Sequence, residues 1–155
     1  MSGLIEARLA ELGIELPRAP APAAAYIPYT RVGDTLYVSG QLPMFKGELC
    51  YAGKIGVELS LEEGQAAARL CAVNLIAQVA DALGGDLDRL LRCVKLGGFV
   101  NATPDFRDHP KVINGASELM IQVFGSIGRH ARFAVGVNSL PLGSSVEIDG
   151  IFQLG

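Results

Sequence analysis

The sequence contains no tryptophan, two histidines and three cysteines, and no two cysteines form a Cys-x-x-Cys pair. An odd number of isolated cysteines, Cys50, Cys71 and Cys93, predicts reduced thiols instead of a disulfide framework. Because only His109 and His130 could join them as nitrogen ligands, we do not expect a structural zinc site. Walker loops, dinucleotide-binding glycine motifs and Gly-x-Ser-x-Gly nucleophile motifs are also missing from the sequence.

Positive charge is not in excess either. The chain has 13 Lys and Arg against 16 Asp and Glu, which gives a net charge of −3 and a pI of about 5.3. This balance does not favour nucleic acid as a partner. No segment reaches the roughly 18 consecutive apolar residues of a membrane span, and the opening residues MSGLIEARLAELGI lack the basic and apolar regions of a signal peptide. We therefore expect a soluble cytoplasmic protein with no membrane contact.

Half of the 155 residues are hydrophobic, which is enough to build one core, so we expect a single domain over residues 1–155. Residues 3–12 carry apolar side chains at helical spacing and are followed by Gly13, which predicts a short amphipathic helix. A strap rich in proline and alanine comes next. About the first 25 residues are thus expected to be a helix and a strap added to the main fold.

The remaining pattern predicts the order β-β-α-β-α-β-β. Ser60-Leu61-Glu62-Glu63 is a capping box that starts a long helix, and Pro110 fits the first turn of a second helix. The expected elements are a hairpin of residues 29–32 and 35–40, a loop over 41–59 with a short strand near 54–57, a helix from 61 to 83, a buried strand over 93–101, a helix ending at Gly125, and two final strands. This order predicts an α+β fold with two helices on one face of a mixed sheet.

Apolar residues recur at every second position of residues 130–153, which is the period of strands with one face against a core. Because Leu140–Gly143 contains a proline and a glycine, we expect a turn there and pairing of the two strands as a hairpin. The side chains expected to face the core are Phe133, Val135, Val137, Val146, Ile148 and Phe152.

Charged side chains occupy the opposite parity of these strands. Arg132 alternates with the small residues Ala134 and Gly136, so we expect its guanidinium over them on the face away from the core, where Glu147 and Asp149 also lie. The simplest interpretation of such a face is that it meets water. The other is that a second copy of the chain covers it.

Arg132 is the strongest single candidate for chemistry, because a guanidinium fork can bind a carboxylate through two parallel hydrogen bonds. Glu147 could position a water or transfer a proton if burial raised its pKa, although a solvated strand glutamate is the more common situation. Arg129, His130 and Arg132 form a small basic cluster without interleaved aromatic residues, which is weak evidence for RNA binding.

Three further positions have two open interpretations each. Ser39-Gly40 either lets backbone N–H groups approach a ligand or is a plain strand exit. Tyr26 either caps a pocket or fills a crevice, and the crevice is favoured. Asn114, inside a helix where its propensity is poor, bonds either a ligand or a loop, and the loop is favoured.

Two segments, RVGDTLYVSGQLP at residues 31–43 and LPLGSSVEI at residues 140–148, resemble the signatures of the Rid family of enamine/imine deaminases, also called YjgF-like or endoribonuclease L-PSP. The resemblance runs from about Tyr26 to Phe152. The N-terminal extension and residues 101–130 are similar to a longer branch of this family. The resemblance implies a chorismate-mutase-like fold and a homotrimer whose sheets form an inner barrel with three clefts between subunits.

The resemblance also implies roles for residues of this chain. Arg132 matches the arginine that binds the substrate carboxylate, and Glu147 matches the glutamate associated with the reactive water. The substrate-binding residues that it implies are Tyr26, Ser39, Gly40, Asn114 and Arg132. The chain departs from the family at Ala134, where a cysteine or small polar residue is frequent, and at Phe133, where a small residue is common.

The implied reaction is hydrolysis of a reactive 2-enamine or 2-imino acid to a 2-keto acid and ammonia, as in 2-iminobutanoate/2-iminopropanoate deaminases, with no metal or organic cofactor. The implied partners are a small 2-imino or 2-keto acid and two further copies of the chain. Two other functions stay open. One is a non-enzymatic trimer that binds small acids or acts like a chaperone. The other, a ribonuclease or translation inhibitor, conflicts with the acidic pI and ranks last.

Overall fold

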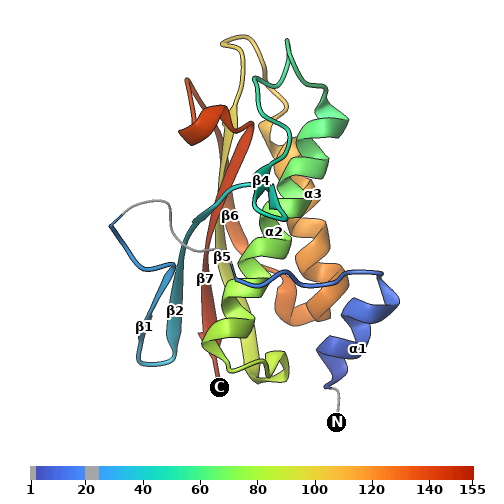
Figure 1. Cartoon of the computed structure of the whole chain (residues 1–155), viewed down its shortest axis with the longest axis vertical. Helices are drawn as coiled ribbons and strands as arrows, with labels where there is room; N and C mark the ends of the chain where they lie inside the picture. The colour runs from blue at the N-terminus through green and yellow to red at the C-terminus, as the bar shows by residue number, and fades with distance from the viewer. Residues whose placement is uncertain (1–2, 20–24) are drawn as a thin grey trace.

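The computed structural model describes residues 3–19 and 25–155. Its main feature is a five-stranded sheet with helices packed on one of its two faces (Figure 1). The strands of this sheet are β1 (Tyr29–Val32), β2 (Thr35–Gln41), β5 (Leu90–Asn101), β6 (Ala131–Val137) and β7 (Val146–Leu154). The other elements are α1 (Leu4–Glu11), the two-residue strands β3 (Met44–Phe45) and β4 (Glu48–Leu49), α2 (Leu61–Ala82), α3 (His109–Phe124), and the 3₁₀ turns η1 (Leu87–Arg89), η2 (Gly125–Gly128) and η3 (Pro141–Gly143).

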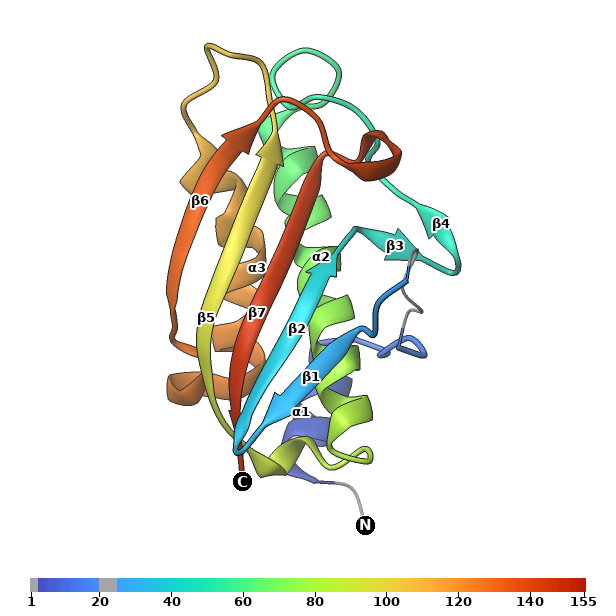
Figure 2. The same cartoon turned by 90° about the vertical axis from the view of Figure 1, so that its left-hand side faces the viewer.

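The strands lie in the order β1-β2-β7-β5-β6, and Figure 2 shows this sheet from its uncovered face with α2 and α3 behind it. β5 and β6 are parallel, whereas the other neighbours are antiparallel. The prediction of a mixed sheet in an α+β fold is therefore confirmed. β6 ends the sheet on one side, so its outer edge has no partner strand among the residues that the structure describes.

The prediction that the last two strands pair as a hairpin is wrong. β5 lies between β6 and β7 and pairs with both of them. The reason is the helix that precedes β6: a strand that follows a crossover helix is delivered parallel to the strand before the helix, which here is β5. The alternation of apolar residues defines the two faces of a strand but does not specify its neighbour.

The core fills the space between the sheet and the helices. Leu96, Val100, Ile148 and Phe152 are fully buried on the helical side of the sheet. α2 begins at the predicted capping box, because Ser60 Oγ accepts from the Glu63 N–H at 3.1 Å and the Glu63 carboxylate accepts from the Ser60 N–H at 3.0 Å. None of the helices in the described ranges is both long enough and apolar enough to cross a membrane.

The N-terminal helix is confirmed as α1, but part of the strap, residues 20–24, lies outside the described residues. The short strand expected near residues 54–57 is replaced by isolated bridges from Ile55 to Leu59 and Ala102. Ile55 is fully buried, and its backbone accepts from the Thr103 N–H and donates to the Asn101 carbonyl, so single bonds and one anchoring side chain hold this segment in place of a ladder. The buried strand expected over 93–101 starts earlier, at Leu90.

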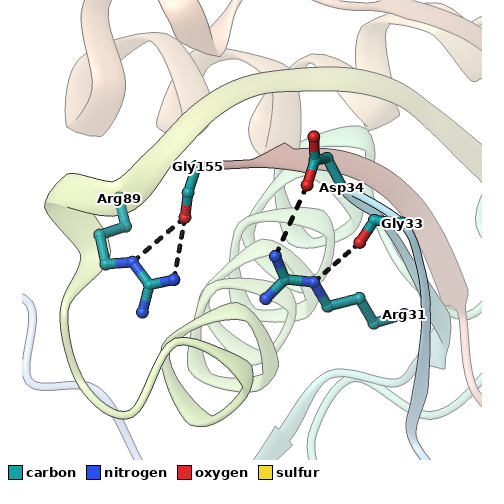
Figure 3. Close-up of polar contacts among 5 residues, drawn as sticks. All are labelled: Arg31, Gly33, Asp34, Arg89 and Gly155. Atoms are coloured by element: carbon teal, nitrogen blue, oxygen red, sulfur yellow. Dashed lines mark hydrogen bonds and ion pairs between the residues drawn. The ribbon is translucent and has the colours of Figure 1, made fainter.

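Polar contacts hold the lower end of the sheet together (Figure 3). The Arg89 guanidinium donates to the Gly155 carbonyl oxygen through Nε at 3.1 Å and Nη2 at 2.9 Å. In the turn between β1 and β2, Arg31 donates to the Gly33 carbonyl and pairs with the Asp34 carboxylate. The Arg89 bonds tie η1 to the residue after β7, the strand that carries Glu147, and the Arg31 contacts close the turn between β1 and β2.

Candidate functional site

Arg132 lies on β6 and points toward α3. Its Nη1 donates to the Ser117 hydroxyl oxygen at 3.1 Å and its Nη2 donates to the Pro110 carbonyl oxygen at 3.1 Å. The predicted alternation with Ala134 and Gly136 is present, since a side chain added at Gly136 would meet the His109 ring of α3. The predicted face is wrong, because Arg132 faces the helical layer and not the uncovered face.

Phe133 takes the opposite position from the one predicted. Its ring packs edge-on against Phe99 of β5, with 5.3 Å between ring centroids, and a side chain at Gly97 would meet both Phe133 and Asp149. Phe133 is therefore on the uncovered face. At an edge strand the helical side is only partly sealed, so it can hold a long polar side chain that still reaches solvent, while an aromatic ring fits the opposite face.

Asn114 belongs with Arg132. It follows Pro110 by four residues and precedes Ser117 by three, so all three lie on one stripe of α3. Arg132 contacts the residues on both sides of it along this stripe. The structure thus forms a first group, Arg132 and Asn114, between the edge strand and α3.

Glu147 lies on the uncovered face of β7 with Asp149, which is the face that the alternation predicts. Burial raises the pKa of Glu147, and the neighbouring charge of Asp149 raises this pKa further. Burial also raises the pKa of Asp149, although backbone N–H groups and Lys95 oppose this shift. A carboxyl with a raised pKa on a sheet face is better suited to exchange protons near neutral pH than a solvated one.

Ser39 and Gly40 form a bulge next to this carboxyl, since the pairing of β2 with β7 shifts between Val38 and Gln41. A side chain at Gly40 would collide with the Glu147 carboxylate, so the missing side chain leaves the space that Glu147 occupies. Ser39 Oγ donates to the Ile27 carbonyl at 3.3 Å. This bond holds the segment of Tyr26, about half exposed at 47%, beside the bulge.

The predicted residues therefore fall into two groups. Arg132 and Asn114 make the arginine group at the β6 edge, whereas the glutamate group on the uncovered face is Glu147, Gly40, Ser39 and Tyr26. Arg132 and Glu147 of one chain do not meet, because they lie on opposite faces and β5 separates their strands. The physical cause of this separation is the position of β5, which sequence patterns do not specify.

Two polar residues beside Arg132 were not predicted as part of its site: Ser117 was not considered, and His130 was considered only in the basic cluster. Ser117 Oγ lies 2.8 Å from His130 Nε2, and His130 Nδ1 lies 2.6 Å from the Gly128 carbonyl oxygen. Burial lowers the pKa of His130. Their spacing carried a signal: Ser117 is one turn beyond Asn114, and His130 has the same parity as Arg132.

A cavity of about 910 Å³ lies elsewhere, beneath the segment that follows α1. It is lined by residues 12–18, by residues 44–47 and by one side of α2, and none of the predicted site residues lines it. In the part of the chain that the structure describes, no group of three His, Cys, Asp or Glu residues is placed to hold a metal ion.

The chain is similar to known proteins along nearly its whole length. The family model described as "YjgF/chorismate mutase-like, putative endoribonuclease" matches residues 6–152. Protein TCP17 of Trypanosoma cruzi is 51% identical over 154 residues, which cover 99% of this chain and 96% of that protein.

Two solved structures share the fold. Atu1372, a protein of unknown function from Agrobacterium tumefaciens, is 51% identical with a TM-score of 0.92, and the match covers 97% of this chain and 92% of that one. A protein from Shewanella oneidensis MR-1, described as a putative endoribonuclease, is 38% identical with a TM-score of 0.94, covering 98% of this chain and 100% of that one. The chain therefore belongs to the YjgF-like (Rid) family, as its two sequence motifs indicated.

Proposed function

We propose that this protein hydrolyses reactive 2-enamine or 2-imino acids to 2-keto acids and ammonia, at clefts between the subunits of a homotrimer. One observation carries the proposal: the Arg132 guanidinium and a carboxyl with a raised pKa, that of Glu147, occupy opposite faces of the same sheet. In one chain they cannot act on one small molecule. A second copy that brings its β6 edge to the uncovered face would join them.

The uncovered face supports such an association. Tyr37 and Val135 are 49% and 42% exposed there, and the Phe133 ring lies on the same face against Phe99. Apolar side chains gathered on one face of a sheet are typical of surfaces that a second chain covers. A cyclic trimer uses the same contact three times, so each cleft would combine the arginine group of one chain with the glutamate group of the next.

The chemistry follows from these two groups. The Arg132 fork holds the carboxylate of the imino acid, and Asn114 lies beside it to bind a second polar group. A water held by Glu147 adds to the imine carbon, and its proton passes through the Glu147 carboxyl to the nitrogen. The new hydroxyl group then gives its proton to the nitrogen as the carbon–nitrogen bond breaks and the carbonyl forms, so the products are one 2-keto acid and one ammonia for each water consumed.

The first test is Arg132→Ala, assayed by ammonia release from freshly generated 2-iminopropanoate. We expect a loss of about a hundredfold in kcat/KM, because both orientation and charge pairing of the carboxylate are removed. Arg129→Ala, an exposed arginine three residues earlier, is the matched control and should retain full activity. Undiminished hydrolysis by Arg132→Ala would exclude the proposal.

Mixing two inactive variants tests the shared cleft. Arg132→Ala and Glu147→Gln chains, each inactive alone, should regain activity after they are unfolded and refolded together. In randomly mixed trimers about one cleft in four combines an intact arginine with an intact glutamate. If both residues acted within one chain, no mixture would recover activity.

A non-enzymatic small-acid-binding trimer is the second candidate function. Ala134, two residues after Arg132 on the same side of β6, offers no polar side chain to assist a reaction. Saturable binding of pyruvate, lost in Arg132→Ala, together with no acceleration of ammonia release would favour this function over catalysis.

A further inference from the structure

A series of hydrogen bonds connects Arg132 through Ser117 and His130 to Gly128. It runs from the Gly128 carbonyl to His130 Nδ1 at 2.6 Å, from His130 Nε2 to Ser117 Oγ at 2.8 Å, and from Ser117 Oγ to Arg132 Nη1 at 3.1 Å. Its members come from η2, from the residue before β6, from α3 and from β6. Two segments of the fold, residues 128–132 and α3, thus meet at one guanidinium.

Chemistry fixes the direction of each bond. The Gly128 carbonyl can only accept, so His130 Nδ1 carries the proton and Nε2 of the neutral ring is an acceptor. The Ser117 hydroxyl therefore donates to Nε2 and turns a lone pair toward Arg132, which can only donate. Burial lowers the pKa of His130, the bond to Gly128 opposes this, and the charge of Arg132 lowers the pKa again. The neutral form of the His130 ring, which this series of hydrogen bonds requires, is therefore favoured over the charged form.

These bonds restrict the guanidinium. Within the described structure, α3 holds two of its five N–H groups, one at Ser117 Oγ and one at the Pro110 carbonyl. Because the two bonds start from different nitrogens, they restrain the rotation of the guanidinium plane, and three N–H groups are left for a ligand. A fork fixed before binding loses less freedom when the ligand arrives.

A serine bonded to a histidine also resembles a nucleophile with its base. The position of Arg132 argues against that role, because its N–H occupies the serine oxygen at which an attacking lone pair would be needed. The same contact is suited to holding the Arg132 guanidinium in place.

We propose that Ser117 and His130 are positioning residues, which hold the Arg132 fork in the orientation that binds a ligand carboxylate. This inference rests on the proposed function, in which Arg132 binds the carboxylate. Neither residue is required to touch the ligand.

Binding of pyruvate, measured by calorimetry, tests the role of Ser117. Ser117→Ala should weaken binding by about tenfold, since a hydrogen bond to a charged group is lost, whereas Ser117→Thr keeps the hydroxyl and should bind nearly as the wild type does. Ser126→Ala, an exposed serine of η2, is the matched control. Binding by Ser117→Ala within twofold of the wild type would overturn the inference, and so would an equal loss in Ser117→Thr.

The pKa of His130 can be measured with and without ligand, and a purely structural role of this residue would leave that pKa unchanged. The charged group that acts on His130 is Arg132. From α3, His130 meets the uncharged Ser117 hydroxyl, and from η2 it meets the Gly128 carbonyl. Lys95 of β5 lies over the Phe133 ring, on the other face of the sheet. Because a bound carboxylate adds negative charge next to this chain, saturating pyruvate should raise the pKa of His130, followed by NMR of the ring protons. The chain has only two histidines, and His109→Gln assigns the signals. A His130 pKa that pyruvate leaves unchanged would overturn the inference.

Failure of the inference can be told apart from failure of the proposed function. If the wild type binds no pyruvate, or Arg132→Ala binds it equally well, the proposed function fails and this inference falls with it. If Arg132→Ala loses binding while Ser117→Ala keeps it, only the positioning role is wrong.

Discussion

At the residue scale, the glutamate group depends on a missing side chain. Gly40 has an ordinary backbone conformation, so its flexibility is not the reason for a glycine here. The reason is space, because the Glu147 carboxylate occupies the volume that a Cβ would fill. A glycine of this kind controls the position of a neighbouring functional group.

We predict that Gly40→Ala folds normally but loses activity. The obstacle is the end of a flexible side chain, so Glu147 can swing away at little cost to stability, but its carboxyl is then misplaced by an ångström or more. We expect imine hydrolysis to fall by about tenfold or more, with an unchanged thermal midpoint. In a Glu147→Gln background the same substitution should have no further effect. An additive loss there would mean that Gly40 acts independently of Glu147.

The pair of Glu147 and Asp149 predicts a pH effect. Burial raises the pKa of Glu147 first, and the charge of Asp149 raises it second. Because Glu147 must be ionised to accept a proton from water, activity should fall as the pH falls through this raised pKa. Asp149→Asn removes the neighbouring charge and lowers the pKa of Glu147, so the acid limb of kcat/KM should move to lower pH. An acid limb that stays in place, or moves up, would contradict this assignment.

At the element scale, α3 has the central role because it contacts both the sheet and α2. Two glycines allow its close approach: a side chain at Gly98 of β5 would collide with Ile113, and one at Gly115 of α3 would collide with the backbone of Gln65 in α2. This close packing determines how far the Pro110–Ser117 stripe stands from β6. The distance that the Arg132 side chain must span to contact α3 therefore depends on these two glycines of β5 and α3.

We predict that Gly115→Ala destabilises the protein even though alanine is the better helix former. Helix propensity would favour alanine by about 1 kcal/mol, but overpacking against a backbone carbonyl typically costs about 1–3 kcal/mol and the two helices must move apart. The net loss should be up to about 2 kcal/mol, measured by urea denaturation. Glu118→Ala, at an exposed position of the same helix, should change stability far less. A more stable Gly115→Ala would mean that the helices separate freely.

At the scale of the whole molecule, the helices cover one face of the sheet and leave the other uncovered (Figure 2). The uncovered face combines exposed apolar residues with two carboxyls that are partly shielded from water. The covered face ends at the β6 edge with Arg132. The proposed trimer uses both features, because the edge of one chain meets the uncovered face of the next.

We predict that the wild type has the mass of three 16.3-kDa chains by light scattering. Val135→Glu should shift this mass to that of one chain, since a charge in the middle of an apolar contact is costly to bury. Ammonia release should be lost in parallel. Val57→Glu, at a residue that is 69% exposed on the loop after β4, is the control and should leave the trimer intact. A wild type that is monomeric at assay concentrations would contradict the shared cleft.

Local patterns in the sequence predicted most of the elements and which side chains of a strand share a face. The capping box at Ser60, the hairpin around Gly33-Asp34 and the parity of Arg132 and Glu147 are local, because they follow from bonding and side-chain direction within a few residues. The family motifs likewise indicated which residues to examine. These parts of the fold and of the site could be predicted from the printed sequence.

The neighbours of each strand, and therefore the residues that come together at a site, followed from long-range packing and not from local patterns. The insertion of β5 between β6 and β7 separates Arg132 from Glu147, and the packing of α3 against the β6 edge turns the Arg132 face toward the helix. Period-two alternation states that two faces differ but not which one a helix will cover. That choice depends on the long-range burial of apolar surface, which is a property of the whole chain.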